Sequence, residues 1–239
     1  MTTCIYDVQE RILAADSRLT NQIWGITSYI DGVVTKIFDH ENIIVAMAGE
    51  NKACEALVDW VRQNDHSVPI PLVGNSDNNI EEFEFIIVFK DDYSLAYFNS
   101  TDGYQQRRPP KEAERFIMIG SGGRYLQDVD LQKTTACEAI QIASTKDYAT
   151  GGDIFFKNLV DGTEELPKYI PMRVVSAIFK VYRGQLNVAE NRIEEKQAPS
   201  YQEEDIDQIV VIAQTELNVK DEEVNILKDL LKNLLAKNV

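Results

Sequence analysis

The sequence predicts an α+β domain in which two helices pack against two mostly antiparallel sheets. The first observation is the order of the predicted elements, which is strands, helix, strands, helix, strands, without regular alternation of single strands and helices. The second is that neighbouring strands are joined by short turn segments such as Gln9-Glu10 and Asp91-Asp92. The third is that 44% of the 239 residues are hydrophobic, which excludes wholesale disorder.

The first part of the chain is expected to form strands followed by a helix. Short runs rich in β-branched and aromatic residues predict strands at 2–8, 11–15, 33–38 and 43–48. The first two runs are separated by Gln9-Glu10, a spacing that suits a hairpin loop. The fourth run ends at Gly49, after which the periodicity changes. Apolar residues then recur at helical spacing, at Ala53, Ala56, Leu57, Trp60 and Val61. This spacing predicts a helix that packs on a sheet.

The second part of the chain repeats the pattern. Further strands are predicted at 83–89, 95–98, 115–119 and 153–159. The segments 65–82 and 99–111 contain many turn-forming residues and are predicted to be loops. Small apolar residues at helical spacing predict a helix over 136–143 that packs closely on another helix.

The composition turns polar around 190–205, which predicts a boundary between a domain at 1–189 and an extension at 190–239. We expect the extension to be a polar linker followed by a terminal helix. An apolar stripe on that helix is formed by Val224, Leu227, Leu231 and Leu234. The stripe either docks on the chain's own core or contacts another subunit or partner, and the sequence favours neither.

Charge and composition argue against several classes of function. A net charge of −15 repels phosphate backbones, so we expect no binding to nucleic acid. No run of about 18 apolar residues occurs, and the N-terminus lacks the basic start of a secretion signal, so we expect no membrane span and no secretion. The three cysteines form no CxxC pair, which argues against a zinc site and fits a reducing cytoplasm. No Gly-Lys-Ser/Thr follows the segment 120–123, so we expect neither a nucleotide nor any other cofactor.

The chain holds only two histidines, so a hydrolase here needs a different base. Removal of Met1 would expose Thr2, which would then carry a hydroxyl and a primary amine on one residue. An α-amine has an unperturbed pKa of about 8, so it can accept the hydroxyl proton near neutral pH. A buried Lys36 would favour the neutral amine, and Asp16 would hold that lysine charged. Taken alone, these residues fit an ordinary first strand better.

Segments along the chain resemble the proteasome β subunits and their bacterial relatives HslV and Anbu. The matching segments are Met1-Thr2-Thr3, Ala14-Ala15-Asp16-Ser17-Arg18-Leu19-Thr20, Thr35-Lys36-Ile37, Ala46-Met47-Ala48-Gly49, Gly120-Ser121-Gly122-Gly123-Arg124-Tyr125 and Asp147-Tyr148-Ala149-Thr150-Gly151-Gly152. They occur in the family's order between residue 1 and about residue 160. The resemblance implies an N-terminal nucleophile (Ntn) hydrolase with a four-layer αββα sandwich and, here, a C-terminal helical extension.

By the same resemblance, the chain is expected to be a threonine-type peptidase. Thr2 would be the nucleophile and its amine the base, Asp16 and Lys36 the supporting ion pair, and the Gly49 N–H the oxyanion donor. Three polar residues would organise the N-terminus, namely Ser121, Asp147 and Thr150. Three others would contact substrate: Thr20 and Asn51 by backbone pairing and Met47 by lining an apolar specificity pocket. Thr3 and Cys4 would compete as nucleophiles only if further residues were removed, and we discount both.

The resemblance also implies partners, namely a peptide or unfolded-protein substrate and further copies of the chain in a ring. It leaves open whether an ATPase partner feeds that ring.

The sequence departs from the family pattern at three positions near the expected site. The loop between Lys36 and Gly49 is one residue shorter, Glu50 stands in place of a glycine, and Thr150 stands in place of a serine. Two rival interpretations remain. One is a catalytically silent structural or interaction protein, which retention of Met1 would favour, and the other is an Ntn amidase for small amides.

Overall fold

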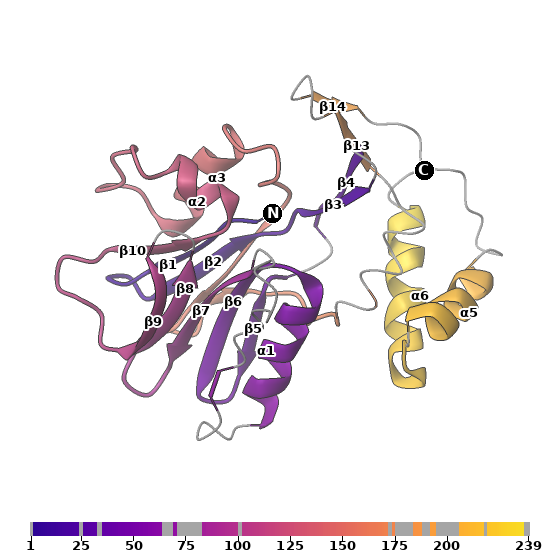
Figure 1. The fold of residues 1–239 in the computed structure, drawn as a ribbon, viewed down its shortest axis with the longest axis horizontal. Helices are drawn as coiled ribbons and strands as arrows, with labels where there is room; N and C mark the ends of the chain where they lie inside the picture. The colour runs from indigo at the N-terminus through magenta and orange to yellow at the C-terminus, as the bar shows by residue number, and fades with distance from the viewer. Residues whose placement is uncertain are drawn as a thin grey trace. The chain divides into compact units, whose positions relative to one another are not determined.

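The computed structural model describes residues 2–23, 26–32, 35–63, 69–70, 83–99, 102–171, 174, 184–187, 192–194, 206–217 and 219–236. The chain divides into two compact units (Figure 1). Unit 1 comprises residues 1–18 and 35–169, and unit 2 comprises residues 19–34 and 170–239. The predicted boundary at 189–190 lies outside the described residues.

The first sheet of unit 1 is antiparallel and has the strand order β10-β1-β2-β11-β12. Its strands are β1 (Cys4–Asp7), β2 (Ile12–Asp16), β10 (Phe116–Ile119), β11 (Ile154–Asn158) and β12 (Glu164–Glu165). The predicted N-terminal hairpin is confirmed, since Cys4 pairs with Ala15 and Asp7 with Ile12. The N-terminal strand therefore lies in the middle of a sheet, where its backbone is paired on both sides.

The second sheet of unit 1 is also antiparallel, with strand order β5-β6-β7-β8-β9. Its strands are β5 (Ile37–His40), β6 (Ile43–Gly49), β7 (Phe83–Phe89), β8 (Leu95–Asn99) and β9 (Gly103–Arg108). The prediction of an uninterrupted loop over 99–111 was wrong, because β9 lies in the middle of that segment. Among the described strands, β9 pairs only with β8 and lies at the sheet edge, which accounts for its polar sequence. Most of the predicted loop at 65–82 lies outside the described residues.

Helices cover both sheets of unit 1. They are α1 (Asn51–Gln63), α2 (Ser121–Tyr125) and α3 (Ala136–Ser144), with α3 capped by a reciprocal Thr135–Glu138 capping box. Ile5 and Ala14 of the first sheet pack with Ile140 of α3. The alternate strand positions, such as Leu13, share a core with Ile86 of the second sheet. Helix α1 contacts β5 and β6 of the second sheet (Figure 1).

The described residues of unit 2 include a small antiparallel sheet and the helices α5 and α6. The sheet has the order β14-β13-β4-β3, with strands β3 (Leu19–Ile23), β4 (Ile26–Ile30), β13 (Gly184–Asn187) and β14 (Arg192–Glu194). The helices α5 (Ile206–Leu217) and α6 (Asp221–Ala236) contact each other, and Lys228 Nζ donates to Asp207 Oδ1 at 2.7 Å. Helix α6 includes the predicted terminal helix, whose Leu227 and Leu231 are buried. Whether the apolar stripe docks on the chain's own core or contacts a partner stays a prediction. None of the helices in the described ranges is long and apolar enough to cross a bilayer.

Candidate active site

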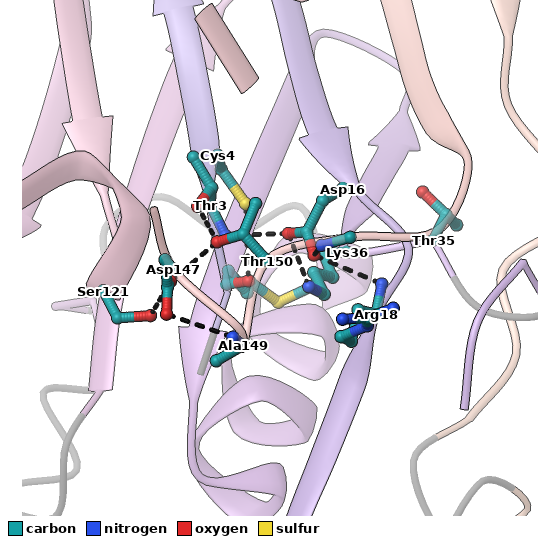
Figure 2. A network of polar contacts seen from close by, with 12 residues as sticks. Thr3, Cys4, Asp16, Arg18, Thr35, Lys36, Ser121, Asp147, Ala149 and Thr150 are labelled. Atoms are coloured by element: carbon teal, nitrogen blue, oxygen red, sulfur yellow. Dashed lines mark hydrogen bonds and ion pairs between the residues drawn. The ribbon is translucent and has the colours of Figure 1, made fainter. Parts of the chain in front are cut away.

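Asp16, the last residue of β2, is a fully buried carboxylate that accepts four N–H donors (Figure 2). Its Oδ1 accepts from the Thr3 amide and from Lys36 Nζ, both at 2.7 Å. Its Oδ2 accepts from the backbone N–H groups of Arg18 at 3.2 Å and Gly151 at 3.0 Å. An ionised carboxylate can only accept hydrogen bonds, so this set of donors suits the charged form of Asp16.

Lys36 reaches Asp16 from the segment just before β5. Its side chain is only 2% exposed, and Asp16 is the sole acceptor of its ammonium among the described residues. The Lys36 carbonyl accepts from the Met47 N–H of β6 at 3.0 Å, which ties the lysine backbone to the second sheet. The structure thus brings the predicted Asp16 and Lys36 into a buried ion pair.

Asp147 is a second buried carboxylate, and it lies in the turn after α3 (Figure 2). Its Oδ2 accepts from the Ser121 hydroxyl at 2.6 Å and from the Thr150 hydroxyl at 2.7 Å. Its Oδ1 accepts from the Ala149 N–H at 3.0 Å. Three residues predicted to act together are therefore in direct contact.

Hydrogen bonds connect both carboxylates to Thr3, the residue after the predicted nucleophile. The Thr3 amide donates to Asp16, and the Thr3 hydroxyl lies 2.5 Å from the Thr150 hydroxyl. Thr2 is 4% exposed, and Gly120, at φ +84°, is so close that an added Cβ would lie 1.9 Å from the Thr2 carbonyl oxygen. A side chain at position 120 would therefore displace the backbone of Thr2.

The other predicted site residues lie in different surroundings. Gly49 ends β6 with φ +115°, a conformation that favours glycine, and the chain enters α1 two residues later. Met47 is buried in β6, and Asn51 is the exposed first residue of α1. Thr20 pairs with Tyr29 in the sheet of unit 2. The oxyanion and substrate roles assigned to these residues remain predictions.

Sequence reasoning assigned no role to Arg18, although it belongs to a matching segment. Its side chain is 8% exposed and donates from Nη1 to the Tyr148 carbonyl at 2.9 Å. The guanidinium lies against Gly151, where an added Cβ would be 2.6 Å from Arg18 Cζ. Arg18 thus links the turn that carries Asp147 and Thr150 to the end of β2 through its hydrogen bond to Tyr148.

Burial disfavours the thiolate forms of the two buried cysteines, Cys4 and Cys54, and so raises the pKa of each. Burial raises the pKa of Cys4 well above its usual value, even though the Lys36 ammonium acts in the opposite direction. Burial also raises the pKa of Cys54 to about 12. Because a thiol attacks as its thiolate, these shifts argue against Cys4 and Cys54 as nucleophiles.

Comparison with known proteins gives matches only among solved structures. HslV from Trypanosoma brucei is 16% identical, with 65% of this chain and 97% of that chain covered and a TM-score of 0.43. Anbu, an ancestral β subunit from Yersinia bercovieri, is 11% identical, with coverage of 69% and 86% and a TM-score of 0.47. Thiobacillus denitrificans BPH in complex with epoxomicin is 13% identical, with coverage of 66% and 99% and a TM-score of 0.41.

No protein-family model and no curated protein matches the chain. The matched structures include HslV and Anbu, the two relatives that the sequence segments resemble. At these identities the likeness concerns the fold and carries no statement about activity.

Proposed function

We propose that the chain is a threonine-type peptidase of the proteasome-like Ntn hydrolase class, with Thr2 as its nucleophile after removal of Met1. One observation carries the proposal: the buried Asp16–Lys36 pair is hydrogen-bonded to the residue next to Thr2. A buried lysine whose charge is held by a carboxylate is what an N-terminal amine needs nearby in order to stay neutral. The packing of helices and sheets in unit 1 supports a four-layer αββα sandwich, and helices α5 and α6 of unit 2 support a C-terminal helical extension.

In the proposed reaction the Thr2 hydroxyl oxygen attacks the carbonyl carbon of a peptide bond while the Thr2 amine takes the hydroxyl proton. The N–H of Gly49 stabilises the oxygen on which negative charge develops. Collapse of the tetrahedral species breaks the C–N bond, the departing amine takes the proton, and an ester remains on Thr2. Water then attacks the ester while the Thr2 amine takes a proton from it. The C–O bond to Thr2 breaks, the amine gives that proton to the Thr2 oxygen, and the acid product leaves.

The second carboxylate cluster would hold the N-terminus in place. Ser121 donates its only hydroxyl proton to Asp147, so its lone pairs remain able to accept from a protonated Thr2 amine. Substrate would be an extended peptide or an unfolded protein that pairs its backbone at Asn51 and places an apolar side chain toward Met47. We further propose that the chain works in the cytoplasm as a homo-oligomeric ring, with or without an ATPase partner.

The test is hydrolysis of fluorogenic peptides by the full chain, combined with intact mass. We expect a mass that lacks Met1, hydrolysis by the wild type, and loss of hydrolysis in Thr2→Ala. Thr163→Ala alters an exposed threonine of unit 1 and should keep full activity. Full retention of Met1 together with an inactive wild type would support a structural role. Activity on small amides alone would support an amidase.

A further inference from the structure

We infer that Thr3 is a positioning residue, which ties the backbone beside Thr2 to both buried carboxylates of the site. The inference rests on the proposed function, because it concerns how the nucleophile is held. Chain ends are usually poorly ordered unless they are tied down, and a nucleophile displaced by about 1 Å can lose 100-fold in rate. A peptidase whose nucleophile is its first residue therefore needs a restraint at the second.

The backbone of Thr3 is held on both sides by Asp16. The Thr3 amide donates to Asp16 Oδ1 at 2.7 Å, and the Thr3 carbonyl accepts from the Asp16 amide at 3.1 Å. The same Asp16 oxygen accepts from Lys36. A shift of Thr3 would therefore disturb the ion pair directly.

The side chain of Thr3 is held by the other carboxylate, through a chain of hydroxyl groups whose direction is fixed. A hydroxyl has one proton, and Thr150 gives its proton to Asp147 Oδ2 at 2.7 Å. In the 2.5 Å contact between the two threonine hydroxyls, Thr3 is therefore the donor. The protons run from Thr3 to Thr150 to Asp147, and Ser121 donates to Asp147 from the other side.

Packing keeps this arrangement in place. Thr3 is fully buried, and α2 approaches so closely that a Cβ on Gly122 would lie 1.8 Å from the Thr3 hydroxyl and 2.6 Å from the Thr150 hydroxyl. The Thr3 hydroxyl consequently has no room to turn toward α2. Thr3 is the residue at which the hydrogen bonds of Asp16 and those of Asp147 meet (Figure 2).

The kinetic test compares Thr3→Val, which keeps the shape and loses the donor, with Thr3→Ser, which keeps the donor. We expect Thr3→Val to lower kcat about tenfold to 100-fold with KM within about twofold, because positioning acts on the chemical step. Thr3→Ser should stay within about threefold of the wild type. Thr150→Val removes the acceptor of this bond together with the Thr150–Asp147 bond, so it should lower kcat at least as much as Thr3→Val while KM stays within about twofold. Wild-type kcat in Thr3→Val, or a loss that Thr3→Ser does not restore, would overturn the inference.

A second measurement does not depend on hydrolysis. NMR hydrogen exchange should show the amide of residue 3 exchanging about tenfold faster in Thr3→Val than in the wild type, and Thr3→Ser should keep the wild-type rate. Equal exchange in all three proteins would overturn the positioning role even in an active enzyme. By contrast, hydrolysis that survives Thr2→Ala would overturn the proposed function and leave the exchange result standing.

Discussion

Replacement of Asp16 by asparagine is the sharpest test of how the buried Asp16–Lys36 ion pair and its backbone donors contribute to stability. The wild-type carboxylate accepts four N–H donors, and its Lys36 partner has no other acceptor among the described residues. An amide of the same size offers one oxygen, while its NH2 group must face two of those donors. Lys36→Met is the complementary change, since it leaves the carboxylate with three backbone donors, from Thr3, Arg18 and Gly151.

The structure predicts unequal losses of stability. Removal of one partner from a buried ion pair costs about 3–5 kcal/mol, because the remaining charge is left uncompensated. In Asp16→Asn the unpaired donors add to this, at about 1–3 kcal/mol for each buried group. We therefore expect Asp16→Asn to lower the free energy of unfolding by about 5 kcal/mol or more, and Lys36→Met by about 3 kcal/mol. A domain is typically stable by about 5–15 kcal/mol, so the first variant lies near the limit of folding.

The assay is equilibrium unfolding in guanidinium chloride, followed by fluorescence of the buried Trp60. Asp128→Asn is the matched control, because Asp128 is exposed and the same change there should leave the unfolding midpoint unaltered. Failure of Asp16→Asn to fold is the extreme of the expected result. The reasoning is refuted if Asp16→Asn is no more destabilising than Lys36→Met, because the backbone donors would then contribute nothing to the site.

Two further predictions concern the surroundings of the site. Gly120→Ala should lower the unfolding midpoint more than Gly103→Ala, because both glycines have positive φ but only Gly120 lies against Thr2, and equal shifts would contradict that contact. The other prediction concerns the loss of folding stability at low pH. Burial acts to raise the pKa of Glu114, but hydrogen bonds from Arg108 outweigh it and lower the pKa. The pair therefore stabilises the fold above the unfolded-state pKa of about 4.3, and this contribution is lost as pH falls through the folded-state pKa. Glu114→Gln should thus lose less stability than the wild type between pH 7 and about pH 3, and identical losses would count against the pair.

The fold of unit 1 could be predicted where burial imposes a pattern on the sequence. The hairpin of β1 and β2 and the apolar run at 83–89 form strands as expected, because both lie inside sheets. Strand β9 was missed because an edge strand with one neighbour has little buried surface and a polar composition. The strands at 19–23 and 26–30 were also missed, because their sheet is completed by residues more than 150 positions away. No local pattern reports such a partner.

The site could be predicted only in part, and the reason is geometric. Asp16, Lys36, Ser121, Asp147 and Thr150 were found by resemblance, and the structure shows how they form two clusters. The positioning role inferred for Thr3 could not be predicted, because a threonine in a predicted strand has no distinguishing sequence signal. That role depends on the hydrogen bond that the Thr3 hydroxyl donates to Thr150. The role of Arg18 could not be predicted either. Its guanidinium can lie against the turn that carries Asp147 and Thr150 only because residue 151 is a glycine.

The energetics of the Asp16–Lys36 pair argue for a role in chemistry over a role in stability. Both charges are withdrawn from water, and a buried ion pair is often no more stabilising than apolar residues of the same volume. Yet the sequence neighbours Ala15 and Ile37 are buried apolar residues, so an apolar side chain at either position would have been compatible with burial. The pair also takes up two backbone donors, from Arg18 and Gly151, and fixes the strand that follows Thr2. Such a concentration of buried polar groups beside Thr2 supports the proposed N-terminal nucleophile.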